Sequence, residues 1–77
     1  MRNAYLELRS LTDAERAAEL LHARRIPARA ERLPAPRGCA FGVRVPAGSL
    51  ETARRLLQAA GLTVLARMDR GGGPAGP

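Results

Sequence analysis

The chain has 77 residues, a net charge of +6 and neither Lys nor Trp, which suits one small domain with an aliphatic core. One Cys and one His are too few for an internal disulfide or a structural zinc site. The sequence shows no signal peptide and no apolar run near the ~20 residues of a membrane span, so we expect a cytoplasmic protein without membrane contact.

The first half of the sequence predicts a strand followed by a helix. Apolar and polar residues alternate over 4–9, as they do on a half-buried strand. Thr12, Asp13 and Glu15 then fit a capping box with Thr12 as the cap, so a helix should begin here. Pro27 cannot continue a helix, which should therefore end near the two arginines that precede it.

Three further strands and one helix are predicted in the rest of the chain. The strands cover residues 26–33, 39–45 and 62–68, where apolar positions alternate. The helix lies between the last two strands, with Ser49 as its cap and Gly61 just beyond its last turn. The strand residues expected to face the core are Ile26, Ala28, Ala30, Phe41, Val43, Val45, Val64, Ala66 and Met68.

The two halves of the chain repeat each other. At an offset of 36 residues the identical pairs include Glu15/Glu51, Ala17/Ala53, Leu20/Leu56, Leu21/Leu57, Ala23/Ala59 and Ala30/Ala66, whereas the strands before the helices align better at 35. This repeat predicts an α+β fold, a ferredoxin-like βαββαβ sandwich. Its four-stranded antiparallel sheet has the strand order 4-1-3-2 and carries both helices on one face. The domain should cover residues 1–70, and the Gly- and Pro-rich residues 71–77 should form a flexible tail.

The only cysteine, Cys39, lies between a Pro- and Gly-rich turn and an alternating strand. In the predicted topology that turn lies at the sheet end where the first strand leads into the first helix. Cys39 should therefore lie near the amide groups around Thr12 and Asp13. A helix N-terminus and nearby arginines, here Arg37 and Arg9, lower the pKa of a thiol and favour the thiolate.

The residues alone leave other interpretations open. Cys39 shares its strand phase with Phe41 and Val43, so it could equally be a buried structural residue. His22, late in the first helix, lies at the end opposite to Cys39 and is expected to be a solvated surface residue. The thirteen arginines are spread along the chain, and the strand over 39–45 lacks outward aromatic side chains, so nucleic acid is not the expected ligand.

The segments RIPAR, PAPRGCAFGVRV and LETARRLLQAAGLTV, within residues 4–68, resemble the family of small selenium/sulfur carrier proteins. In that family a Pro-x-Pro-Arg segment precedes a short loop and Cys-Gly; here the loop is Gly38 alone, and Ala40 replaces the second glycine. The resemblance implies a persulfide or perselenide on Cys39, supported by Arg37 and Gly38, with no separate cofactor. It also implies a PLP-dependent cysteine desulfurase or selenocysteine lyase as donor, and a selenophosphate-synthesising or thiol-modifying protein as acceptor.

The segments I-P-A, V-x-V-P and A-R-x-L-L also resemble small prokaryotic signal-transducing modules. That resemblance implies a non-enzymatic domain that binds a ligand or a protein, in which the cysteine is structural. The sheet residues that would form its binding face are Tyr5, Arg9, Arg29, Arg44 and Arg67. On both interpretations the chain is a carrier or binding protein rather than a stand-alone enzyme, and its open sheet face favours a homo-oligomer.

Overall fold

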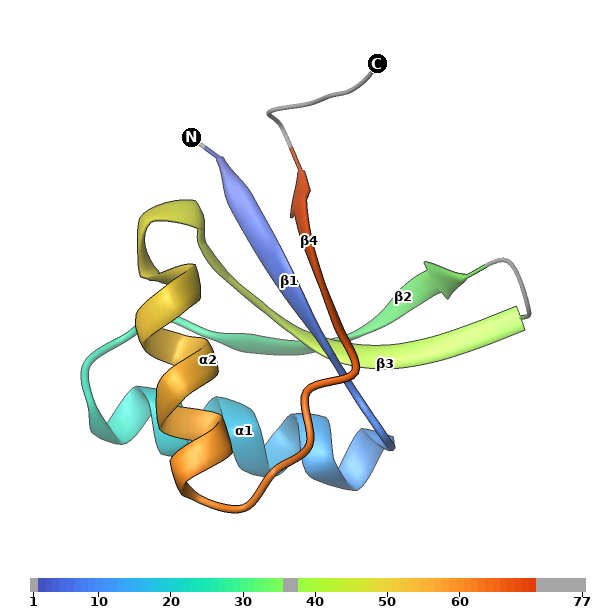
Figure 1. Cartoon of the computed structure of the whole chain (residues 1–77). Coiled ribbons are helices and arrows are strands. Elements are labelled where there is room, and N and C mark those ends of the chain that lie inside the picture. Colours follow the sequence, from blue (N-terminus) through green and yellow to red (C-terminus); the bar gives the residue numbers. More distant parts are fainter. Residues whose placement is uncertain (1, 36–37, 71–77) are drawn as a thin grey trace.

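The computed structural model describes residues 2–35 and 38–70, within which the side chains of 34–35, 38–39 and 67–70 are not described. Two strand–helix–strand units follow each other along the chain, and Figure 1 shows both helices on one side of a twisted sheet. The elements are β1 (Asn3–Leu8), α1 (Leu11–Ala23), β2 (Arg29–Ala35), β3 (Gly38–Pro46), the 3-10 turn η1 (Ala47–Ser49), α2 (Leu50–Ala59) and β4 (Ala66–Arg70).

The core lies between the two helices and the faces of β1 and β3 that point toward them. Every second residue of β1 is buried, and α1 and α2 bury small and branched residues at helical spacing, so the elements meet along apolar stripes. The buried members of this cluster are Ala4, Leu6, Leu8, Ala17, Ala18, Leu21, Val43, Val45, Ala53, Leu57 and Leu62.

β1 pairs antiparallel with β3, from Asn3 opposite Pro46 to Leu8 opposite Phe41. β2 pairs antiparallel with the other edge of β3. The predictions for the first and third strands, 4–9 and 39–45, are confirmed to within one residue at each end. The second strand, expected over 26–33, instead covers Arg29–Ala35.

The sequence predicted a ferredoxin-like sandwich with a four-stranded sheet, and this prediction is wrong. The body of the fold is a three-stranded antiparallel sheet, in the order β1-β3-β2, with two helices. Residues 62–65 belong to no strand, although the expected fourth strand began at Leu62. Only the short β4 adds to this sheet, at the outer edge of β1.

The fourth strand differs because the chain after α2 first covers the core. Leu62 is buried and Val64 packs against the core cluster, so the chain reaches β1 only at Leu65. The Leu65 N–H donates a hydrogen bond to the Glu7 carbonyl oxygen at 2.9 Å. Pairing begins one residue later with Ala66 opposite Glu7, and Ala66 is exposed rather than inward.

Met68 was expected to face the core, and the register of β4 against β1 contradicts this expectation. Met68 lies opposite Tyr5, which alternates with the buried residues Ala4 and Leu6 of β1. Residues directly opposite each other in antiparallel strands belong to the same face of the sheet. The position of Met68 therefore belongs to the face away from the helices.

Both helices end in the same hydrogen-bonded turn, a Schellman motif. After α1, the N–H groups of Arg25 and Ile26 donate to the carbonyl oxygens of His22 and Leu21, each at 2.9 Å. The equivalent two bonds after α2 are both 3.0 Å, and Gly61 takes the place of Arg25. The prediction that Gly61 follows the second helix is confirmed, with φ of 88°.

Arg25 occupies this left-handed position with φ of 64°, the one positive value among the described residues other than glycine. The Cβ atom of an L-residue comes too close to the backbone in this conformation, which costs about 1–2 kcal/mol. The turn after α1 is therefore held against local strain by the packing of the partly buried Ile26 on the core.

Replacing Arg25 tests this strain. At an ordinary helix position alanine is more stabilising than glycine by about 1 kcal/mol. At residue 25 the order should reverse, with Arg25→Gly more stable than Arg25→Ala by about 1 kcal/mol, because glycine adopts a positive φ without strain. Both variants remove the same charge, and urea denaturation measures the difference. A more stable Arg25→Ala protein would contradict the left-handed turn.

A second stability prediction concerns Gly42 of β3. A Cβ atom there would overlap the Leu6 carbonyl oxygen and lie 2.6 Å from Cδ1 of Leu33. Gly42→Ala should therefore lower the free energy of unfolding by about 1–3 kcal/mol through overpacking. Gly48→Ala is the matched control, because nothing lies within 4 Å of its added Cβ, and it should change stability by less than about 0.5 kcal/mol. Equal melting temperatures for the two variants would refute the close approach.

Candidate functional site

The backbone of Cys39 lies near the start of β3, opposite Pro34 of β2. β1 pairs with β3 only from Phe41 onward, so the residues before Phe41 pair with β2 alone. Figure 1 shows this end of the β2–β3 hairpin extending beyond the end of β1. We call residues 33–35 and 38–40 the hairpin arm. Cys39 thus belongs to a two-stranded extension rather than to the three-stranded centre of the sheet.

The expected surroundings of the thiol are described only in part. Gly38 lies opposite Ala35 and is the first residue of β3. Arg37 lies outside the described residues, and so does the side chain of Cys39. Arg9 is exposed and follows the last residue of β1. The group of Cys39, Arg37 and Arg9 therefore stays a prediction.

The first turn of α1 begins two residues earlier than expected. Ser10, not Thr12, is the N-cap, and the Asp13 N–H donates a hydrogen bond to the Ser10 Oγ at 3.1 Å. Thr12 is exposed within the helix, and Asp13 is half-buried in its first turn. The Asp13 amide, one of the groups expected to support an anion, is thus already engaged by Ser10.

The cap of α2 also differs from the expectation. Ser49 does precede the helix, but its side chain accepts no hydrogen bond from the first turn. The turn η1 leads the backbone into α2 instead, and the cap N–H at Leu50 donates to the Ala47 carbonyl oxygen. Backbone geometry therefore starts this helix without help from the serine hydroxyl.

The face of the sheet away from the helices carries a row of polar residues. Arg44 of β3 lies opposite both Tyr5 of β1 and Arg29 of β2. Arg67 was also expected on this face. Its position on β4 lies opposite Leu6, so it belongs to the other face of the sheet. The row Tyr5–Arg44–Arg29 therefore retains three of the five residues proposed for a binding face.

One ion pair lies on this open face. Arg44 Nη2 is 2.9 Å from Glu31 Oε2, and both side chains are about 70% buried, at exposed fractions of 32% and 27%. Glu31 lies two residues after Arg29 on β2, on the same face of the sheet. The carboxylate thus neutralises one of two arginines that face each other across neighbouring strands.

An open depression lies where this row meets the edge of the sheet. Its volume is about 380 Å³, and we call it the basic depression. Its lining residues are Asn3, Pro27, Ala28, Arg29, Arg44, Val45 and Pro46. Asn3 was not singled out from the sequence, because its place beside Arg44 depends on the β1–β3 register.

His22 lies at the end of α1 and contacts the wall of the basic depression. Its Nε2–H donates a hydrogen bond to the Ala28 carbonyl oxygen at 2.7 Å. The side chain is exposed, as the sequence predicted. This bond links the last turn of α1 to the residue that precedes β2.

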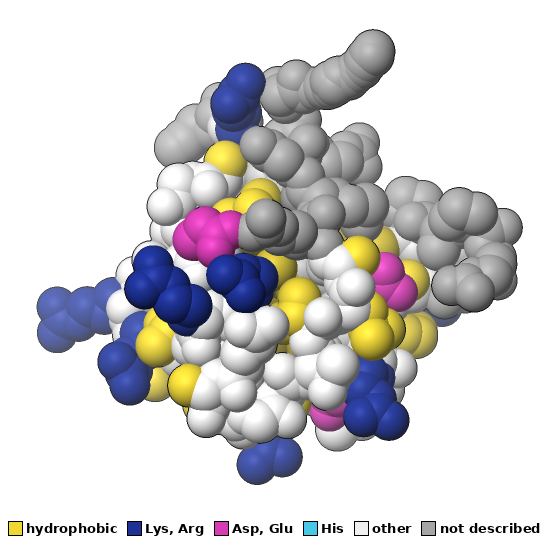
Figure 2. Space-filling view, in the orientation of Figure 1, with side chains coloured by type: hydrophobic (Ala, Val, Ile, Leu, Met, Phe, Trp, Pro, Cys, Tyr) yellow, Lys and Arg dark blue, Asp and Glu magenta, His cyan; other side chains and the backbone are white. Residues whose placement is uncertain are grey.

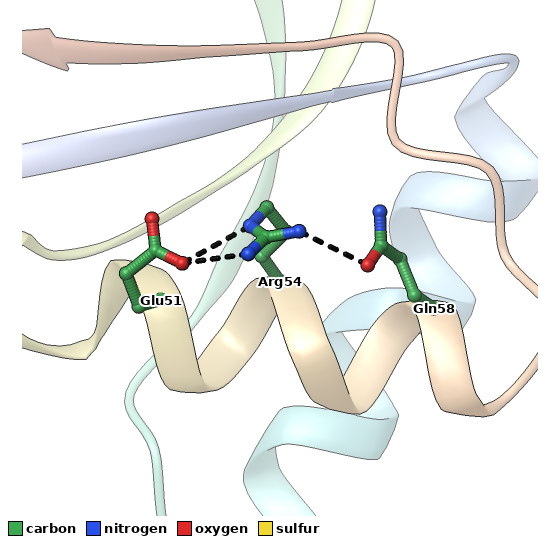
Figure 3. Close-up of polar contacts among 3 residues, drawn as sticks. All are labelled: Glu51, Arg54 and Gln58. Atoms are coloured by element: carbon green, nitrogen blue, oxygen red, sulfur yellow. Dashed lines mark hydrogen bonds and ion pairs between the residues drawn. The ribbon is translucent and has the colours of Figure 1, made fainter.

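Other polar side chains are engaged locally on α2. Arg54 donates from Nε and Nη2 to Glu51 Oε1 at 3.2 and 2.8 Å, and from Nη1 to Gln58 Oε1 at 3.1 Å. Figure 3 shows the three side chains aligned along one side of the helix. Such pairs three and four residues apart stabilise a helix surface, so Arg54 is a structural residue.

The remaining charges do not form one continuous surface in the view of Figure 2, where blue arginine side chains are scattered among yellow and white groups. Within residues 2–35 and 38–70, no group of three or more His, Cys, Asp or Glu side chains could hold a metal ion. No helix in the same ranges is long and apolar enough to cross a membrane.

Comparison with known proteins gives no relative: no protein-family model, no curated protein and no solved structure matches the chain. The resemblances to selenium/sulfur carriers and to signal-transducing modules therefore depend on the sequence motifs alone. The function that follows is argued from the residues and their positions.

The revised helix cap can be tested directly. Ser10→Ala should lower the free energy of unfolding by about 1 kcal/mol, because it removes the hydroxyl that accepts from Asp13. Thr12→Ala should be neutral or slightly stabilising, since Thr12 is an exposed helix residue and alanine has the higher helix propensity. Thermal unfolding of the two variants compares them. The reverse order would restore Thr12 as the cap.

Proposed function

We propose that the chain is a sulfur or selenium carrier that holds a persulfide or perselenide on Cys39. The observation that carries this proposal is the backbone position of Cys39 on the hairpin arm, outside the part of the sheet that β1 covers. A carrier must present one thiol to two partner proteins in turn. A two-stranded extension suits that role, because fewer neighbouring elements obstruct a partner there.

The transfer step needs only one thiolate and a persulfide donor. The Cys39 thiolate attacks the terminal sulfur of the donor persulfide, and a new S–S bond forms on Cys39. The original S–S bond of the donor breaks, and its cysteine thiolate leaves. A thiolate enters and a thiolate departs, so no oxidant or reductant is consumed. A selenium atom would be transferred in the same way.

The charge of the chain supports this chemistry. A persulfide is an anion at neutral pH, and the net charge of +6 favours anionic groups and acidic partner surfaces. Arg37, two residues before Cys39, is the side chain we expect to act on the thiolate most directly. The donor class is a PLP-dependent desulfurase or lyase, and the acceptor class is a selenophosphate-synthesising or thiol-modifying protein.

A second candidate function is a non-enzymatic binding module. The row Tyr5–Arg44–Arg29 and the basic depression favour it, because they supply cationic donors on an open sheet face. In this case Cys39 is structural. The two candidates use different residues, so they can be tested separately.

The carrier proposal predicts a covalent product on one residue. Incubation of the chain with a cysteine desulfurase, PLP and cysteine should add about 32 Da, one sulfur atom, to Cys39. Intact mass spectrometry before and after a thiol reductant measures the adduct, which reduction should remove. Cys39→Ser is the control and should gain no mass. An unmodified wild-type chain under conditions that load a known acceptor would refute the proposal.

The effect of Arg37 can be measured as a change in the pKa of the Cys39 thiol. The rate of alkylation of Cys39 against pH should give a pKa below the usual ~8.5 of a free thiol. Arg37→Gln should raise this pKa, because it removes a cation near the thiolate. Arg55→Gln on α2 removes the same charge from an exposed helix position and should leave the pKa unchanged.

A further inference from the structure

Arg29 and Arg44 lie directly opposite each other on β2 and β3, on the face away from the helices. Like charges in this arrangement repel, so the pair lowers the stability of the sheet. Glu31 offsets the repulsion only for Arg44, with which it forms an ion pair at 2.9 Å. Among the described residues Arg29 has no such partner, which leaves one uncompensated positive charge at this edge.

Both arginines line the basic depression, and Asn3 from β1 lines it beside them. Its volume of about 380 Å³ falls within the ~300–1,000 Å³ of small-molecule sites. Asn3 is half-buried, and its amide group can donate a hydrogen bond. The strands β1, β2 and β3 therefore each bring one polar donor to the same concave surface.

The walls of the basic depression are held in place on two sides. Pro27 and Pro46 both line it, and a proline has a fixed φ and no N–H group of its own. The hydrogen bond of 2.7 Å from His22 holds the Ala28 backbone against α1. The ion pair with Glu31 restricts the motion of the Arg44 side chain. A site that needs little rearrangement loses less entropy when a ligand binds.

We propose that the basic depression binds the phosphate group of a small molecule. One arginine fork is sufficient for a planar carboxylate, which has two oxygens. Two guanidinium groups from neighbouring strands together with the Asn3 amide instead suit a group with three or more outward oxygens. Arg29 supplies the uncompensated charge, and Arg44, whose charge Glu31 offsets in part, supplies further N–H donors. The proposal extends the second candidate function and does not involve Cys39.

The test is an NMR titration of the ¹⁵N-labelled full chain with inorganic phosphate at constant ionic strength. The amide signals of Ala28, Arg29, Arg44 and Val45 should shift and saturate together. Arg29→Gln should weaken the affinity at least about tenfold, or 1.4 kcal/mol, because it removes the uncompensated charge. The Arg29 side chain is exposed, so its replacement should not unfold the chain, and the amide spectrum of the variant checks the fold directly.

Arg32→Gln is the matched control for Arg29→Gln. Arg32 lies on the same strand and carries the same charge, but it belongs to the opposite face and stacks 5.9 Å from the centre of the Phe41 ring. The affinity of the Arg32→Gln variant for phosphate should stay within about twofold of that of the unchanged chain, as expected for a surface substitution outside the site. Cys39→Ser should also bind phosphate normally, whichever way the carrier test ends.

Three results would overturn the proposal. The first is the absence of saturable phosphate shifts in the unchanged chain. The second is an equal loss of affinity in Arg29→Gln and Arg32→Gln, which would indicate a general charge effect. The third is binding of acetate as tight as that of phosphate, or binding of a single-stranded oligonucleotide without binding of phosphate. Either part of the third result would assign the surface to another ligand class.

Discussion

At Gly42 the backbone of β3 runs so close to β1 that a Cβ atom would overlap the Leu6 carbonyl oxygen. The missing side chain also leaves room for Leu33 of β2, which is buried against this point. The close contact accompanies a register in which Leu6 lies opposite Val43, so that both face the helices. A shift by one residue would turn these apolar side chains toward water. In the same register the pairing of β1 with β3 ends at Phe41, and Arg44 lies between Tyr5 of β1 and Arg29 of β2.

Local sequence predicted the helices and two strands well, but it placed both strands that follow a helix too early. Ile26 and Leu62 are apolar and begin an alternating pattern, so strands were expected from 26 and 62. In the structure each of them packs on the core from a connection, and the strands begin at Arg29 and Ala66. Alternation cannot separate a strand residue from a connecting residue that is buried for another reason. The cap of the first helix was also assigned wrongly: Thr12 fits a capping box with Glu15, but in the structure Ser10 caps the helix.

The faces of the fourth strand were assigned from its alternating pattern, and the internal repeat does not correct that assignment, because its two halves pair differently. Ala30 lies opposite Val43, and the residues equivalent to this pair in the repeat are Ala66 and Leu8. Ala66 instead lies opposite Glu7, one residue out of step, which exchanges the two faces of β4. The sequence did place Arg29 and Arg44 on the open face. Their direct opposition is a property of the register, which depends on contacts far apart in the chain.

The hairpin arm and the basic depression occupy opposite ends of the same two strands. Arg44 lies five positions after Cys39 on β3, a backbone distance of about 17 Å at the ~3.4 Å rise of a strand. A persulfide extends a thiol by only about 2 Å, one S–S bond, so sulfur on Cys39 cannot reach a phosphate held by Arg44 of the same chain. A bound phosphate could therefore affect the thiol only through β2 and β3 or through a shared partner. Each site must be explained by its own chemistry, and evidence for one leaves the other to be tested.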